Sequence, residues 1–362
     1  MIRILMAFVV LLFTINGFVF GAVPVPLKKV RIVVGTTMVN ISYPYLNLPL
    51  ALGYWKEEGY DVELVPLAPP AQSIALLIAG KADFGIVNAN VLAKAVTLND
   101  EPVKVAMMTD VVNWKIGVEA TSSVGSLKDL KGKTIGTFGL ASGGVALLRA
   151  TLTENGIDPD RDVHIIAVGG GAPAMQALRS REVQALFFWS SAMASFENAG
   201  LKMRYLAAED WTTLPDFGVS VMQSTVASDP KMVLGISRGI AKATLFAFTN
   251  PDCVRRIQWK TWPSTKATGS SDDQVLARWD MNTLNGELSP MHTAYDLSGG
   301  KYYGAVSRAG YDKLQQYMLK TGQIPKIVPV SQYFVDIPNL QEKINDFQKE
   351  PIIHAAQTCV GF

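Results

Sequence analysis

Short apolar runs alternate with helical patterns in the first third of the chain. The run at 30–34 is rich in β-branched residues, and 60–66 alternates apolar with acidic positions, as strands do. The segments between such runs have helical periodicity and end at glycines. This alternation predicts a parallel sheet with right-handed crossovers. The predicted strands are 30–34, 60–66, 82–87 and 103–108, and the predicted helices are 48–58, 72–79 and 91–98.

The alternation restarts after residue 114 and predicts a second α/β unit of similar size. Segments 114–118 and 217–222 are interpreted as the two crossings between the units. The expected strands of the second unit are 133–137, 163–168, 185–188 and 203–206, its helices are 145–154, 173–179 and 192–198, and a helical turn is expected at 126–130.

From residue 229 onward the pattern is mainly helical. A helical segment of this kind usually packs on an existing sheet. We therefore predict lobe 1 at 29–113, lobe 2 at 114–217, and a return to lobe 1 with a helical C-terminal extension at 218–362. The helices expected in the extension are 232–248, 252–262, 272–284, 311–321 and 340–349.

The N-terminus has the pattern of a secretory signal peptide. Arg3 precedes an apolar run, and the small residues Gly21 and Ala22 suit cleavage. A membrane anchor is the alternative, but the polar Asn16 interrupts the run and leaves it shorter than the roughly 20 apolar residues that a span needs. Residues 1–22 are therefore predicted to be removed. No later segment looks both long and apolar enough to cross a bilayer, so we expect a soluble periplasmic protein.

Composition and charge exclude several classes of function. The chain has 362 residues, with 33 Lys+Arg against 31 Asp+Glu, and this balance argues against nucleic acid as the main partner. The three histidines lie far apart and the cysteines are two, which excludes a zinc-protease site and a four-cysteine zinc site. Export also removes the chain from the cytoplasmic pools of nucleotide and nicotinamide cofactors, so we expect no metal and no cofactor. Export permits a disulfide between Cys253 and Cys359, and two buried free thiols are the alternative.

Three sequence stretches carry a resemblance to a known family. They are PLALGYWKEEGYDVE at 49–63, AGKADFG at 79–85 and LKDLKGKTIG at 127–136. With the order of elements, they resemble the substrate-binding proteins of ABC importers, in the branch that binds alkanesulfonates, taurine, nitrate and thiamine precursors. The resemblance covers residues 30–217. It implies the two-lobed periplasmic binding protein type II fold, with two mainly parallel sheets joined by two hinge crossings and a helical C-terminal extension.

The resemblance also implies a function. Proteins of this class are not enzymes: they capture a small solute between the lobes and deliver it to an ABC permease in the inner membrane, which works with its ATPase. We expect a monomer. An enzyme related to thiamine-pyrimidine synthesis and a periplasmic sensor input protein are the alternatives. Relatives of the first kind carry His and Cys in the cleft, whereas here the cysteines lie in the C-terminal third and His164 falls inside a predicted strand.

The candidate binding residues follow from the fold class. Ligands of open α/β sheets bind beyond the carboxyl ends of the strands, so these residues lie in the loops after the predicted strands and at the two crossings. The candidates are Tyr43, Tyr45, Gln72, Asn88, Asn90, Trp114, Ser142, Gly143, Gly144, Gly171, Trp189 and Asp216.

Each kind of candidate has a functional and a structural interpretation. Ser142 and the two glycines after it open a helix whose free N–H groups suit an anion, although an ordinary helix cap has the same pattern. Trp189 and Tyr43 can cover a planar solute or fill the core. Asn88 and Asn90 offer donors and acceptors, and Asn90 can instead cap a helix. We expect a planar organic solute with an anionic or polar end, and no catalytic residue.

Overall fold

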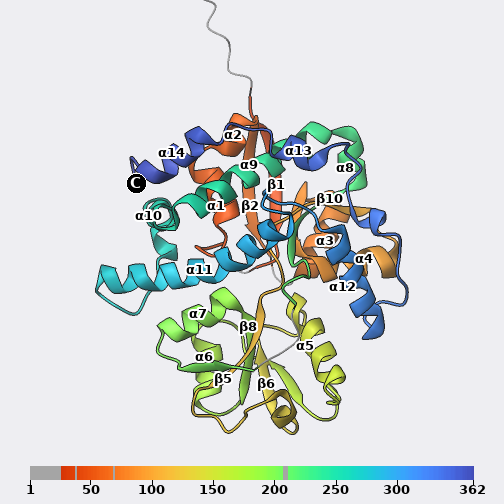
Figure 1. Ribbon diagram of the computed structural model, residues 1–362, viewed down its shortest axis with the longest axis vertical. Coiled ribbons are helices and arrows are strands. Elements are labelled where there is room, and N and C mark those ends of the chain that lie inside the picture. Colours follow the sequence, from red (N-terminus) through yellow and green to blue (C-terminus); the bar gives the residue numbers. More distant parts are fainter. Residues whose placement is uncertain (1–25, 37–38, 68–69, 207–210) are drawn as a thin grey trace, which may run out of the picture.

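The computed structural model describes residues 26–36, 39–67, 70–206 and 211–362. The predicted signal peptide, residues 1–22, lies outside these residues. The described chain folds into two lobes, one above the other in Figure 1, and each lobe is built on its own sheet.

The first sheet has the strand order β2-β1-β3-β10-β4. Strands β1 and β2 pair in parallel from Lys28 opposite Tyr60 to Val34 opposite Pro66, and β3 is parallel to β1. Strand β10 runs antiparallel to both of its neighbours. The strands are β1 (Lys28–Val34), β2 (Tyr60–Pro66), β3 (Phe84–Asn88), β4 (Val103–Met108) and β10 (Phe217–Met222).

Helices cover this sheet as the alternation predicts, with one difference. The helix expected at 48–58 is two helices, α1 (Pro44–Ala51) and α2 (Tyr54–Glu57). Pro44 starts α1 earlier because proline suits the first helical turn, and Gly53, at φ +77°, breaks the helix. The other helices of this region are α3 (Pro70–Ile78) and α4 (Ala89–Asn99).

The second sheet has the order β7-β6-β8-β5-β9, and β5 is antiparallel to both of its neighbours. In each sheet the antiparallel strand is therefore a crossing strand, β5 or β10. The strands are β5 (Trp114–Glu119), β6 (Thr134–Thr137), β7 (His164–Ala167), β8 (Ala185–Trp189) and β9 (Met203–Tyr205). The helices are η1 (Leu127–Leu130), α5 (Gly143–Glu154), α6 (Ala172–Arg179) and α7 (Ser190–Asn198).

The C-terminal extension is helical, as predicted, but two of its helices differ from the prediction. Helix α11 (Asp273–Leu297) runs well past residue 284, and the helix expected at 340–349 ends at Ile344. Two further helices were missed, α8 (Gln223–Ser228) and α14 (Glu350–Thr358), and α14 has a proline in its first turn. The remaining elements are α9 (Pro230–Thr249), α10 (Pro251–Thr261), η2 (Pro263–Thr265), α12 (Arg308–Lys320), η3 (Val330–Tyr333) and α13 (Leu340–Ile344).

Helix α9 corrects the expectation that no later segment is long and apolar enough to cross a bilayer. Its 20 residues meet that criterion by length and composition. However, 72% of its apolar window is buried, among the hydrophobic residues of the lobe 1 core. A helix that is apolar on most of its surface is also what the centre of a large soluble domain requires.

The two cysteines are paired. Cys253 in α10 and Cys359, just after α14, form a disulfide with their Cα atoms 5.7 Å apart. This resolves the alternative between a disulfide and free thiols. The bond fastens the end of the chain to α10, across a sequence separation of 106 residues.

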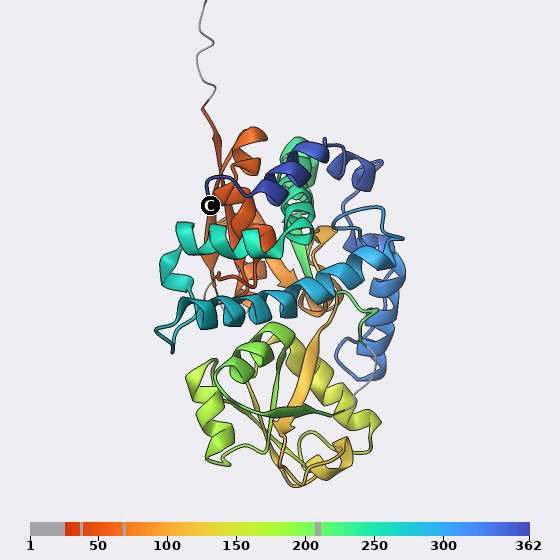
Figure 2. The ribbon, with the colours of Figure 1, turned by 60° about the vertical axis from the view of Figure 1, so that its left-hand side comes forward.

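Two parts of the extension also contact lobe 2. Helix α11 lies across the boundary between the lobes and packs on α7, where Asn198 Nδ2 donates to the Trp279 carbonyl at 2.8 Å (Figures 1 and 2). On the side of α5, Lys320 of α12 pairs with Glu154 at 2.5 Å, and Gln323 Nε2 donates to the Ala146 carbonyl at 3.1 Å. The extension therefore holds the lobes together on two sides.

Candidate ligand-binding site

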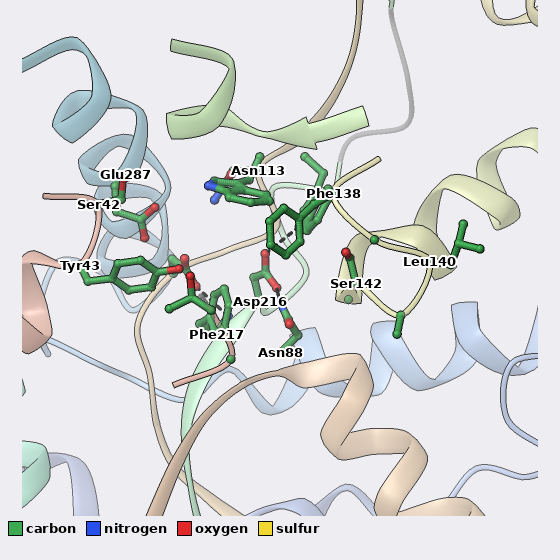
Figure 3. A pocket seen from close by; sticks show the side chains of 18 residues that line it. Ser42, Tyr43, Asn88, Asn113, Phe138, Leu140, Ser142, Asp216, Phe217 and Glu287 are labelled. Atoms are coloured by element: carbon green, nitrogen blue, oxygen red, sulfur yellow. Dashed lines mark hydrogen bonds between the residues drawn. The ribbon is translucent and has the colours of Figure 1, made fainter. Parts of the chain in front are cut away.

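A cavity of about 320 Å³ lies between the lobes (Figure 3). This volume is at the lower end of the range of small-molecule pockets, about 300–1,000 Å³. Lobe 1, both crossings, lobe 2 and α11 all contribute to its wall. The lining residues are Gly35, Thr36, Ser42, Tyr43, Asn88, Asp110, Asn113, Trp114, Phe138, Gly139, Leu140, Ala141, Ser142, Gly143, Trp189, Asp216, Phe217 and Glu287.

Aromatic rings form the lobe 2 side of the cavity. Trp189 ends β8 and is partly exposed, and its ring meets Trp114 edge to face at 5.4 Å and Phe138 at 5.8 Å. Trp114 stacks on the buried Phe187 at 5.0 Å, which fixes its position. A partly exposed indole held by neighbouring rings presents a rigid apolar face to a solute at little entropic cost.

Three buried carboxyl groups line the same cavity. Asp110 follows β4, Asp216 precedes β10 and Glu287 lies in α11, and they are 1%, 5% and 6% exposed. Asp110 and Asp216 belong to the two crossings, which pair through an isolated bridge between Val111 and Pro215. The acidic groups therefore sit at the hinge and on the helix that spans the lobes.

The two hinge carboxylates accept defined hydrogen bonds. Asp216 Oδ1 accepts from Asn88 Nδ2, and Asp216 Oδ2 accepts from Trp114 Nε1 at 3.3 Å. Asp110 Oδ1 accepts from the Phe217 amide at 2.8 Å. Because Asn88 ends a lobe 1 strand and Trp114 starts a lobe 2 strand, Asp216 ties both lobes to the second crossing.

Burial raises the pKa of all three groups, because a charged carboxylate is costly in a dry site. The pKa of Asp216 rises to about 6, the hydrogen bonds from Asn88 and Trp114 opposing the effect of burial. The pKa of Glu287 rises to about 8, mainly through burial and further through the charge of Asp216. Burial, followed by the charges of Glu287 and Asp216, also raises the pKa of Asp110 well above its ordinary range.

Asp110 and Glu287 are hydrogen-bonded to each other. Two carboxyl groups can make such a bond only if one of them holds a proton. This bond raises the pKa of Asp110 and lowers that of Glu287. At least one proton is therefore held between Glu287 of α11 and Asp110 of the first crossing.

Seven of the twelve predicted residues line the cavity. They come from loops after four strands and from both crossings. They are Tyr43, Asn88, Trp114, Ser142, Gly143, Trp189 and Asp216.

The other five predicted residues lie elsewhere, for identifiable reasons. Tyr45 is completely buried behind Tyr43, with the two rings 6.1 Å apart. Gln72 is exposed near the start of α3, and Gly171 is exposed before α6. Asn90 is turned toward α5, where its Nδ2 donates to the Gly143 carbonyl at 2.5 Å.

Gly144, the last of the five predicted residues that do not line the cavity, lies at the start of α5, where the helix packs against other residues. A Cβ atom on Gly143 would lie 2.5 Å from the side chain of Asn88, and one on Gly144 would overlap the ring of Trp114. The Ser142 side chain makes no capping hydrogen bond. Both glycines are therefore required by the close approach of Asn88 and Trp114, while Ser142 and Gly143 still line the cavity.

Several lining residues were missed. Asp110, Asn113 and Phe138 do follow strands or lie in a crossing, so the rule that found Asp216 applies to them as well. Ser42 directly precedes Tyr43. Glu287 is in the middle of a helix, where no sequence signal marks a binding residue. The other missed residues are Gly35, Thr36, Gly139, Leu140, Ala141 and Phe217.

The lining residues include no lysine, arginine, histidine or cysteine. Lys115, at the crossing, instead lies over the ring of Tyr205, 4.9 Å from its centroid. Among the residues that the structure describes, no group of His, Cys, Asp and Glu is arranged to hold a metal ion. The polar groups available to a solute are therefore carboxyl, amide and hydroxyl groups.

The two sheets, their strand orders and the paired crossings define the two-lobed periplasmic binding protein type II fold, with a cavity between the lobes. The chain belongs to the NMT1/THI5-like family, whose model matches residues 48–253. A comparison with curated proteins gives no match.

Solved structures share this fold. A protein from Bordetella bronchiseptica RB50 is 18% identical with a TM-score of 0.68, covering 90% of this chain and 98% of its own. The periplasmic aliphatic sulphonate binding protein SsuA from Escherichia coli is 15% identical with a TM-score of 0.62, covering 85% and 92%. The desulfurization enzyme DSZB is 14% identical with a TM-score of 0.58, covering 88% and 99%. At these identities the likeness establishes the fold.

Proposed function

We propose that this protein is the solute-binding component of an ABC import system. It acts in the periplasm as a monomer, captures a small organic solute between its lobes and delivers it to a membrane permease with its ATPase. The observation that carries the proposal is the cavity itself, which is lined by both lobes and by both crossings. A solute held there contacts both lobes at once, so its binding favours the closed arrangement.

The positions of histidine and cysteine favour binding over catalysis. The enzyme alternative, a relative of thiamine-pyrimidine synthases, calls for these residues in the cleft. Here both cysteines form the disulfide at α10 and α14. His164 is exposed on β7, His292 stacks on Phe248 and His354 is exposed on α14.

Native mass spectrometry of the purified protein tests the proposal. A small molecule should copurify in a one-to-one complex and be released on unfolding. In the Trp189→Ala variant, affinity for that molecule should fall by about 1–3 kcal/mol, the scale of one lost aromatic contact. Melting without ligand should hardly change, because the ring is partly exposed.

The matched control is Trp262→Ala, because Trp262 is also partly exposed but does not line the cavity. This variant should bind as the wild type does. If Trp189→Ala lowers the melting temperature sharply while affinity is kept, Trp189 is a core residue and the binding site lies elsewhere. Turnover of the copurified molecule would support the enzyme alternative instead.

Export can be tested separately. The periplasmic protein should begin just after Gly21 or Ala22, because the sequence there suits signal-peptide cleavage. N-terminal sequencing of the periplasmic fraction measures this directly. A chain that still starts at Met1 would contradict periplasmic release and favour the membrane-anchor alternative.

A further inference from the structure

Among the described residues, the cavity is lined by acidic side chains and by no basic ones. Asp110, Asp216 and Glu287 face it from three different elements, and none of its lining residues is a base. Buried carboxylates are normally paired with a cation or saturated with hydrogen bonds. The partners of the three groups therefore show whether the protein itself balances this charge.

The hydrogen bonds are distributed unevenly. Asp216 accepts from Asn88 and Trp114. Asp110 accepts from the Phe217 amide and, at 3.3 Å, from Thr109 Oγ1. Glu287 has only the bond shared with Asp110 among the described residues. A carboxyl group has room for about four such bonds, so Glu287 keeps acceptor capacity at the cavity.

The Ser42 hydroxyl is a further polar group at the cavity. Ser42 is 6% exposed and lines the cavity, and Figure 3 shows its side chain among the lining groups. Its backbone N–H donates to Asn40 Oδ1 at 2.9 Å, which holds the residue at the cavity wall. Ser42 and Glu287 both line the cavity, so a polar ligand group can meet a hydroxyl and a carboxyl with free acceptor positions.

We propose that the solute carries a protonated nitrogen, as in an amine or amidine, that binds Asp110, Asp216 and Glu287, attached to a planar body that packs on Trp189. The proposal rests on the proposed function, since it concerns the solute of the same cavity. It replaces our expectation of an anionic end.

An anion would meet an unfavourable field here. It would lie beside Asp216, which is charged above its pKa of about 6, with no lysine or arginine among the described residues of the wall to balance it. Like charges repel strongly in a dry site. A cation instead supplies the charge and the donors that the carboxyl groups lack.

Binding of a cation also accounts for the shared proton. With the cation in place, the carboxyl groups favour their charged forms, and the proton between Asp110 and Glu287 passes to solvent. The exchange is balanced, with one positive charge entering and one proton leaving. Proton release on binding is therefore a signature that a purely structural role for the acid pair would not produce.

The experiment uses three probes that share an aromatic ring: benzamidine as the cation, benzyl alcohol as the neutral probe and benzenesulfonate as the anion. Isothermal titration calorimetry on the solute-free protein should show benzamidine binding at least about tenfold more tightly than either of the others, the scale of one hydrogen bond to a charged group. Repeating the titration in buffers of different ionisation enthalpy should show net proton release.

Glu287→Gln is the main variant, because it keeps the size and removes the charge. It should weaken benzamidine binding about tenfold to a hundredfold and reduce proton release. The matched control is Asp296→Asn, which removes an exposed carboxylate from the same helix and should bind benzamidine as the wild type does. Asp110→Asn provides a second test if Glu287→Gln does not fold.

The outcomes separate this inference from the proposed function. Benzenesulfonate binding that depends on Trp189, without benzamidine binding at millimolar concentration, would overturn the cationic solute and leave the capture function standing. Stabilisation by Ca²⁺ or Zn²⁺ but not by benzamidine would also overturn it, because the carboxyl groups would then be metal ligands. If no copurified molecule is found and no probe depends on Trp189, the proposed function itself fails.

Discussion

Replacing both Cys253 and Cys359 by serine should lower the free energy of unfolding by about 4–5 kcal/mol. The disulfide closes a loop with a sequence separation of 106 residues, and in the chain-entropy description a loop of this length restricts the unfolded state by about that amount. The bond also fastens α14 and the chain end to α10. Guanidinium unfolding of the variant and the oxidised wild type measures the difference.

The control for this prediction is reduction of the wild type. Reduced wild type and the double serine variant should unfold at similar denaturant concentrations, and a reducing agent should leave the variant unchanged. The affinity for benzamidine should be kept, because neither cysteine lines the cavity. Equal stability of the variant and the oxidised wild type would show that α14 is held without the bond.

Strand positions were the most predictable part of the fold. The bounds predicted for β2, β4 and β10 are those of the structure. These strands combine an alternating or continuous apolar pattern with β-branched residues, and both signals are local. The two crossing strands were located as well. Strand β5 comes after β4 of the first sheet and belongs to the second sheet, and β10 comes after β9 of the second sheet and belongs to the first.

Helix ends were less predictable where distant contacts decide them. Helix α11 continues through Pro290, although a proline inside a helix removes a backbone hydrogen bond. Its packing on α7 and on the lobe 1 core compensates, with Leu288 and Met291 buried. Nothing in the sequence near residue 284 indicates that lobe 2 will lie against this helix.

Some residues of the candidate site could likewise be predicted from local patterns, and others could not. The rule that ligands lie beyond the carboxyl ends of strands located Asn88 and Trp189, and the position of the crossings located Asp216, since both depend only on topology. It does not reach Glu287, which α11 brings to the hinge from the helical extension. It also does not give the charge of the solute, because the three carboxyl groups meet only in the folded protein.

The same helix connects closure to recognition. Helix α11 supplies Glu287 to the cavity and contacts α7 of lobe 2 through Asn198 and Asn282. A solute bound to Glu287 is therefore held by the element that spans both lobes. Because Glu287 is buried in this helix, its protonation state also affects the stability of the solute-free protein.

Without solute, the protein should lose stability as the pH rises from about 4.5 to about 8. The folded-state pKa of Glu287 is raised from 4.5 to about 8, and that of Asp216 from 3.8 to about 6, so the folded protein binds protons that the unfolded chain releases. Stability from a raised carboxyl pKa is complete below the unfolded pKa and is lost as the pH passes through the folded pKa. Each such proton contributes at most about 1.4 kcal/mol per pH unit.

The titratable groups near Glu287 do not oppose this loss of stability with rising pH. Asp110 and Asp216 act in the same direction, because burial raises the pKa of each. Burial also raises the pKa values of Tyr43 and Tyr45 further above 10, so both tyrosines remain neutral across the window. The loss of stability therefore originates from the three carboxyl groups.

Glu287→Gln should flatten this pH dependence, and thermal unfolding of the solute-free protein between pH 4.5 and 8.5 measures it. At pH 8 the variant should be more stable than the wild type by a few kcal/mol, because it no longer carries a buried charge, and the two should converge near pH 4.5. Asp296→Asn should keep the wild-type slope. Saturating benzamidine should reverse the trend in the wild type, since a bound cation favours the charged carboxylates. A wild-type profile as flat as that of Glu287→Gln would show that Glu287 is already charged in the empty cavity, with a counterion in place of the shared proton.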